Sequence, residues 1–113
     1  MALYSVDGLQ PMTADAIRFH PDLPGLCRHY GVLRLDLFGS AAAGTEHREQ
    51  SDLDFLVEFI APSSAGYADD FFGFKEALER LFERPVDLVV ASAIRNPYFL
   101  ESVQRARRPV YAA

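Results

Sequence analysis

The 113 residues are half hydrophobic and about a quarter charged, which is the composition of one folded domain and excludes a disordered or low-complexity chain. The formal net charge is −5, from 11 basic and 16 acidic side chains, so direct nucleic-acid binding is not expected, because it needs a basic face. No stretch resembles a membrane helix or a secretory signal, and Cys27 is the only cysteine, so we expect a cytoplasmic protein with no membrane anchor and no internal disulfide.

The first part of the chain predicts an irregular arm followed by a helix. Residues 1–13 contain turn residues and no sustained period, so the folded domain is expected to span residues 14–113. Asp22 is a candidate helix N-cap, and Gly31 stands where that helix would end. Between them apolar residues recur at helical spacing, at Leu23, Leu26, Cys27 and Tyr30.

Three apolar segments predict strands. In Val32–Phe38, leucines alternate with Arg34 and Asp36, which is the pattern of a strand with one buried face. The segment Asp52–Ile60 is apolar on both faces after its first residues, which predicts a central strand. A third, short strand is expected at Val86–Val90.

Two further segments predict helices. Residues 67–82 carry an aromatic and aliphatic stripe at helical spacing, with charged residues on the opposite side. Asn96 followed by Pro97 is a typical helix start, and this last helix is expected to run through Arg107 and to be ended by Pro109.

Acidic side chains lie at the ends of these predicted strands. Asp52 and Asp54 are two residues apart, so their side chains leave one face of a strand about 6.6 Å apart. Two carboxylates aimed into one space repel each other unless a cation lies between them, and Mg²⁺ prefers such oxygen ligands. Asp87, with apolar neighbours on the third strand, is the natural third ligand. The three aspartates therefore predict a site for one Mg²⁺ ion or a pair, which would also hold substrate phosphates.

A phosphate-binding turn is expected where the first strand ends. Gly39 lets a phosphate approach the backbone closely, and Ser40 adds a hydroxyl beside the backbone N–H groups. Each motif alone is weak, since an isolated Asp-x-Asp is more often only the polar start of a strand. The order Gly-Ser, then Asp-x-Asp, then a single Asp on the next strand is far more specific.

These motifs carry a resemblance to a known family. The segments Tyr30–Gly44, Ser51–Phe59 and Pro85–Val89 resemble the minimal nucleotidyltransferase (MNT) family of the DNA polymerase beta-like superfamily, over roughly residues 22–111. The resemblance implies a nucleotidyltransferase fold, a single α/β (α+β) domain with a mixed sheet of three to four strands flanked by helices.

The resemblance also implies a site and an activity. Asp52, Asp54 and Asp87 would be the catalytic residues and would bind two Mg²⁺ ions, while Gly39 and Ser40 would bind the triphosphate of ATP. Members of the family transfer a nucleotide to an acceptor hydroxyl and release pyrophosphate. MNT proteins are commonly the antitoxins of HEPN-domain toxins, and some transfer AMP to a tyrosine of the toxin.

The loop after the Gly-Ser motif departs from the family pattern. Between Ser40 and Asp52 it is one residue longer than usual, and Ala43 stands where the family commonly has a basic residue. Cations around a transferring phosphoryl group stabilise the transition state, so the change bears on catalysis. His47 and Arg48 of the same loop could supply the cation, which makes Arg48 a candidate nucleotide-binding residue.

Two alternatives to protein adenylylation stay open at this point. One is a non-catalytic antitoxin that neutralises its partner by occlusion. The other is a nucleotidyltransferase with a small-molecule acceptor, which we rank lowest because a chain of this length has no room for an acceptor-binding domain. The same argument makes a partner protein that presents the hydroxyl the expected solution.

Overall fold

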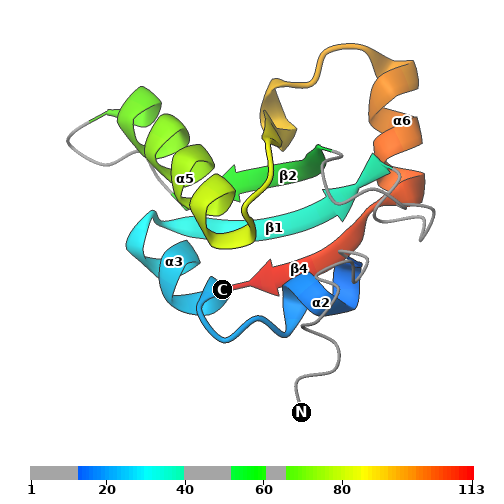
Figure 1. Cartoon of the computed structure of the whole chain (residues 1–113). Helices are drawn as coiled ribbons and strands as arrows, with labels where there is room; N and C mark the ends of the chain where they lie inside the picture. The colour runs from blue at the N-terminus through cyan, green and yellow to red at the C-terminus, as the bar shows by residue number, and fades with distance from the viewer. Residues whose placement is uncertain (1–12, 40–51, 61–65) are drawn as a thin grey trace.

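The computed structural model describes residues 13–39, 52–60 and 66–113, which form one mixed sheet with helices around it (Figure 1). The strands are β1 (Val32–Phe38), β2 (Leu53–Phe59), β3 (Val86–Val90) and β4 (Arg108–Ala112). The helices are α2 (Ala14–Arg18), α3 (Leu23–His29), α5 (Tyr67–Phe82) and α6 (Pro97–Ala106), with a 3₁₀ turn η1 (Ala91–Ala93) after β3.

The sheet has the strand order β3-β2-β1-β4. Strand β1 is antiparallel to both β2 and β4, whereas β2 and β3 are parallel, so the sheet is mixed as expected. The prediction that the second strand is central is confirmed, since β2 lies between β1 and β3, and four of its seven residues are buried and the other three partly buried.

One face of the sheet carries the hydrophobic core. Leu35 and Leu37 of β1 and Phe55 of β2 are fully buried and belong to one cluster with Phe74 and Leu78 of α5. The cluster is completed from the N-terminal helices by Ile17, Leu23 and Cys27. Helices α2, α3 and α5 therefore cover this face of the sheet. The strand residues that alternate with the core residues point to the opposite face.

Helix α6 packs on that opposite face. Its residue Phe99 meets Phe38 of β1 edge-on, with ring centroids 6.3 Å apart. In Figure 1 it stands apart from the other helices, near the end of β1. Asn96 caps its first turn, accepting hydrogen bonds from the backbone N–H groups of Tyr98 (2.9 Å) and Phe99 (3.2 Å), which confirms the predicted helix start.

Strand β1 departs from the predicted alternation. Leu33 is 43% exposed and Asp36 only 3% exposed, the reverse of a strand with one buried leucine face. The register explains part of the difference, because it shifts between Val32 and Arg34, so that Leu33 lies in a bulge. Asp36 is buried for a second reason, its ion pairs with two arginines, which are described below.

Neither α2 nor β4 was predicted. The short helix α2 follows Thr13, whose side chain accepts a hydrogen bond from the N–H of Ala16 at 3.2 Å. Strand β4 contains Pro109, which was expected only to end the preceding helix; a proline is tolerated there because β4 is an edge strand. Asp22 occupies the predicted N-cap position of α3 but its side chain makes no capping hydrogen bond. The predicted arm, residues 1–13, lies almost wholly outside the described residues.

None of the helices in the described ranges is both long and apolar enough to cross a bilayer.

The reactivity of Cys27 toward thiol reagents is a measure of whether this core is intact. Its side chain is fully buried, and burial raises the pKa of the thiol from 9.0 to about 12. Because only the thiolate reacts readily, we expect Cys27 to be inert to thiol reagents in the folded protein at pH 8 and to react fully in denaturant. Rapid labelling under native conditions, followed by mass spectrometry, would contradict this placement.

Candidate active site

Asp54 and Asp87 are direct neighbours across two strands. In the parallel pairing of β2 with β3, Asp54 is in register with Asp87, so the two carboxylates leave the same face of the sheet side by side. Asp52 immediately precedes β2 and is exposed. The structure thus brings together the three aspartates that the sequence singles out, at the end of the sheet where β2 begins.

The clustering is visible in the acid–base properties of Asp54. Burial, and after it the negative charges of Asp87 and Asp52, raise the pKa of the Asp54 carboxyl above its usual value. All three carboxylates therefore contribute to one electrostatic environment. A positive charge placed among them would relieve the repulsion.

Gly39 lies directly against the carboxylate of Asp54. Its φ angle is +78°, in the left-handed region that favours glycine, and an added Cβ would collide with Oδ2 of Asp54. Phe38, the residue before it, is in register with Asp54. A residue with a side chain at position 39 would cover the carboxylate, so glycine keeps Asp54 accessible from this side.

The donor set suits a hard divalent cation, although it is not closed around one. The three groups offer only carboxylate oxygens, which Mg²⁺ prefers. Within residues 13–39, 52–60 and 66–113, no three His, Cys, Asp or Glu side chains are arranged to hold a metal ion. Binding by all three aspartates would therefore require their side chains to turn toward one another.

The other predicted site residues fall in the loop between β1 and β2. Ser40 and Arg48 lie outside the described residues, as do Ala43 and His47. Their proposed contacts with a triphosphate stay predictions.

A glutamate that the sequence did not single out fixes the start of β3. The carbonyl of Pro85 accepts a hydrogen bond from the N–H of Leu53 at 3.0 Å, so the N–H of Val86, across the same peptide bond, points away from β2 to the open edge of the sheet. Oε2 of Glu79 on α5 accepts this N–H at 3.0 Å. The ammonium of Lys75 donates to the same oxygen at 3.1 Å, and both contacts lower the pKa of Glu79. Glu79 thereby anchors the residue that precedes Asp87.

Loss of this anchor should weaken the site without removing any ligand. We expect Glu79→Ala to reduce the affinity for Mg²⁺ by roughly tenfold, as outer contacts to metal ligands commonly do. Glu79→Gln, which keeps an acceptor oxygen for Val86, should retain most of the affinity. Glu76→Ala, an exposed position on the same helix, is the matched control. Equal affinities of all four proteins in isothermal titration calorimetry would contradict a role for Glu79 in positioning Asp87.

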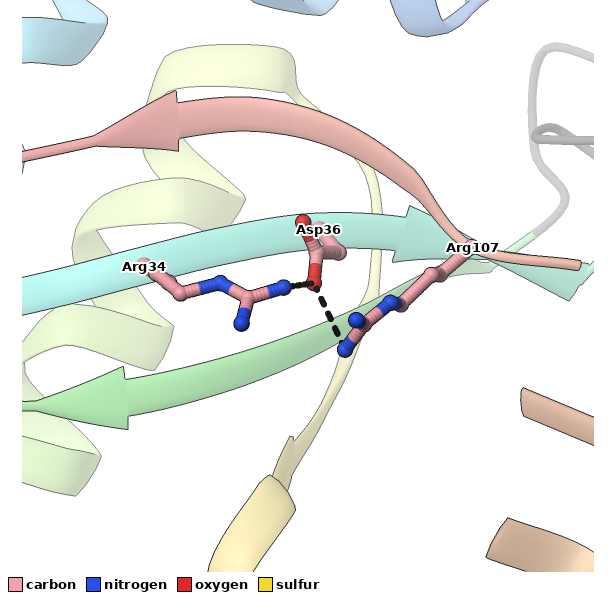
Figure 2. Close-up of polar contacts among 3 residues, drawn as sticks. All are labelled: Arg34, Asp36 and Arg107. Atoms are coloured by element: carbon pink, nitrogen blue, oxygen red, sulfur yellow. Dashed lines mark hydrogen bonds and ion pairs between the residues drawn. The ribbon is translucent and has the colours of Figure 1, made fainter. Parts of the chain in front are cut away.

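A second charged group lies on the same face of the sheet (Figure 2). Oδ2 of Asp36 on β1 is 3.2 Å from the guanidinium of Arg34 and 3.6 Å from that of Arg107, which follows α6. Its other oxygen, Oδ1, is buried and has no hydrogen-bond partner among the described residues. No local sequence pattern indicates this cluster, because the alternation in β1 predicts a solvent-facing Asp36 and Arg107 lies 71 positions further along the chain.

The three aspartates form a negatively charged surface beside the turn at Gly39. Such an arrangement can hold a divalent cation and, through it, the phosphates of a nucleotide.

Comparison with known proteins identifies the family that the sequence motifs resemble. The sequence profile of the nucleotidyltransferase domain family matches residues 23–110. A Methanocaldococcus jannaschii protein named "Putative protein adenylyltransferase MJ0128" is 38% identical over 90 residues, covering 80% of this chain and 86% of that protein.

Solved structures agree with this result. One described as "Structure of putative minimal nucleotidyltransferase" has a TM-score of 0.63 and 33% identity and covers 96% of both chains. A crystal structure of a toxin–antitoxin with AMP-PNP gives a TM-score of 0.62 at 22% identity, covering 79% of this chain and 69% of that one. A tri-AMPylated Shewanella oneidensis HEPN toxin in complex with an MNT antitoxin gives 0.60 at 14% identity, covering 89% and 74%. The last two likenesses concern the fold alone.

Proposed function

This chain belongs to the nucleotidyltransferase domain family as a minimal nucleotidyltransferase, and from that premise we propose that it transfers AMP from ATP to a tyrosine hydroxyl of a partner HEPN toxin and thereby acts as an antitoxin. The observation that carries the proposal is the contact between Gly39 and Asp54 beside Asp87, because it combines an open phosphate approach with clustered carboxylates.

Asp52, Asp54 and Asp87 are the residues that would hold Mg²⁺, in one or two ions. The cation would neutralise charge on the α-phosphate and on the departing pyrophosphate. The raised pKa of Asp54 supports the assignment, since it reflects the burial of the carboxyl and, after it, the negative charges of Asp87 and Asp52.

The reaction is a single displacement at the α-phosphorus. The acceptor oxygen forms a bond to this phosphorus while the bond to the bridging oxygen of the β-phosphate breaks, and the hydroxyl proton leaves to a carboxylate of the site or to water. Gly39 and the loop that follows it would orient the β- and γ-phosphates, and the three aspartates would hold the Mg²⁺ that orients the α-phosphate. The protein contributes mainly positioning and electrostatic stabilisation.

Support for the HEPN partner comes from the fold neighbours. A structure of the same fold was solved with a tri-AMPylated HEPN toxin in complex with an MNT antitoxin. A partner that presents a hydroxyl beside the aspartates would make the displacement effectively intramolecular.

The proposal is tested by following the α-phosphate and the γ-phosphate of ATP separately. The protein is mixed with Mg²⁺, a HEPN toxin encoded beside it, and ATP labelled at either the α- or the γ-phosphate. We expect label to appear on the toxin from α-labelled ATP only, and not when EDTA is added. Transfer of the γ-label would indicate a kinase, and absence of both labels from a neutralised toxin would indicate occlusion.

A further inference from the structure

A cavity of about 340 Å³ lies between α6 and the face of the sheet that carries the aspartates. Its floor includes Leu56, which is two residues from Asp54 on β2 and therefore on the same face, about 6.6 Å away. Its walls come from Ser92 of η1 and from Leu100 and Gln104 of α6. The cavity thus opens one side chain away from the proposed site of phosphate chemistry.

The cavity and the glycine turn lie on opposite sides of Asp54. Because β1 and β2 are antiparallel and Phe38 is in register with Asp54, Gly39 lies toward the start of β2. Leu56, in register with Asp36, lies in the other direction along β2. The line from the turn to the cavity therefore passes over the carboxylate of Asp54.

This order selects which part of the reaction occupies the cavity. In a phosphoryl or nucleotidyl displacement, the attacking oxygen and the leaving oxygen are roughly in line on opposite sides of the phosphorus. If the β- and γ-phosphates lie at Gly39, as the proposed function requires, the attacking hydroxyl must approach from the side of Leu56. The nucleoside is attached to the phosphorus through neither the attacking nor the leaving oxygen, so it does not lie on this line. The cavity therefore fits the acceptor better than the base of the nucleotide.

The lining indicates the chemical class of the acceptor. Asp36 pairs with the guanidinium groups of Arg34 and Arg107 (Figure 2), and all three residues line the cavity. Arginine planes stack on aromatic rings, and Leu56 and Leu100 add apolar surface. An aromatic hydroxyl is therefore favoured over the short hydroxyls of serine and threonine, which would leave the arginines and leucines without contacts.

We propose that the cavity between α6 and the sheet, with Asp36 as the residue that positions Arg34 and Arg107, is the subsite that receives the acceptor tyrosine of a partner protein. The assignment rests on the proposed function for its orientation, since Gly39 is taken as the triphosphate side. It adds a location and a recognition mode for the acceptor.

A binding measurement tests the subsite without requiring any transfer. The full chain, labelled with ¹⁵N and loaded with Mg²⁺ and non-hydrolysable AMP-PNP, is titrated with N-acetyl-tyrosinamide and separately with N-acetyl-serinamide. We expect the tyrosine compound to shift the amide signals of Leu56, Ser92 and Gln104, and the serine compound to shift them several-fold less. Shifts confined to other parts of the chain, or equal shifts with both compounds, would overturn the proposal.

A matched pair of variants extends the test to the reaction. Ser92→Trp would fill the cavity, whereas Ser102→Trp places the same side chain at an exposed position of α6 that does not line it. We expect Ser92→Trp to lower AMP transfer to the toxin at least tenfold with the affinity for AMP-PNP unchanged, and Ser102→Trp to change neither. If Ser92→Trp is unfolded, as judged by its melting curve, Gln104→Trp replaces it.

The outcomes separate this inference from the proposed function. If the tyrosine compound shifts the signals at the cavity but no AMP is transferred to any HEPN toxin, the subsite is supported and the adenylyltransferase activity is contradicted. If Ser92→Trp leaves AMP transfer intact, the subsite is contradicted and the adenylyltransferase activity is supported. Loss of AMP-PNP binding in Ser92→Trp would show that the nucleoside occupies the cavity, which also overturns the assignment.

Discussion

Asp54→Asn is expected to make the protein more stable and inactive at the same time. The pKa of Asp54 is raised in the folded state, so its ionised form disfavours folding at neutral pH. Removing the charge should stabilise the fold by less than about 1 kcal/mol and raise the melting temperature by no more than a few degrees, a small effect because the group is partly exposed. Transfer should fall by roughly 10³-fold or more, since the metal-binding carboxylate is lost.

The pH dependence of this stabilisation has a defined sign. Below the usual pKa of an aspartate, Asp54 is protonated in both the folded and the unfolded state of the wild type, and the variant has no advantage. As the pH rises through the raised pKa of the folded state, the wild type loses stability and the variant does not. The difference in melting temperature should therefore be absent at low pH and full at neutral pH.

Differential scanning calorimetry without divalent ions measures this difference. Asp69→Asn is a control, because Asp69 is an exposed residue in the first turn of α5, where a negative charge is favourable. Its loss should lower the melting temperature slightly. Addition of Mg²⁺ should stabilise the wild type and the control but not Asp54→Asn. A wild type that is more stable than Asp54→Asn in EDTA at pH 7 would contradict the repulsion at this site.

Gly39→Ala should damage the site far more than the same change at another left-handed glycine. Gly31 has a φ angle of +68° and Gly39 one of +78°, so alanine at either position costs about 1–2 kcal/mol of backbone strain. A Cβ at Gly31 would meet nothing within 4 Å, whereas one at Gly39 would collide with Oδ2 of Asp54. Only Gly39→Ala should therefore displace the Asp54 carboxylate.

Two measurements on the pair separate strain from damage to the site. Urea unfolding should show Gly39→Ala to be destabilised by at least about 1 kcal/mol more than Gly31→Ala, because the collision adds to the strain. The affinity for Mg²⁺–AMP-PNP should fall at least tenfold in Gly39→Ala and stay unchanged in Gly31→Ala. Equal losses of affinity in both variants would mean that Gly39 is only a structural turn.

The sequence was sufficient for the central part of the fold because the signals there are local. The bounds of β3 and of α5 match their predictions, since each depends on the period of its own apolar residues. The sequence relates Asp54 to Asp87 because a motif with a fixed order connects them. Their alignment in the register of β2 and β3 is consistent with that motif.

Interactions between distant segments could not be predicted in the same way. Asp36 is buried because Arg107 follows α6 and α6 packs back on the sheet, and no local pattern contains that information. Strand β4 forms because it pairs with residues Arg34 to Leu37 of β1, although its own sequence contains a proline. Glu79 has a charged neighbour at helical spacing, but its contact with Val86 depends on how α5 crosses the end of β3.

The most direct test of the proposed function is the mass of a HEPN toxin produced together with this protein. With the wild type, we predict a toxin that is neutralised and heavier by one or more AMP groups, with the added mass on a tyrosine. With Asp54→Asn, we predict an unmodified and active toxin, although the variant is folded. A toxin that is neutralised by Asp54→Asn as fully as by the wild type, with no added mass in either case, would contradict the adenylyltransferase and establish occlusion instead.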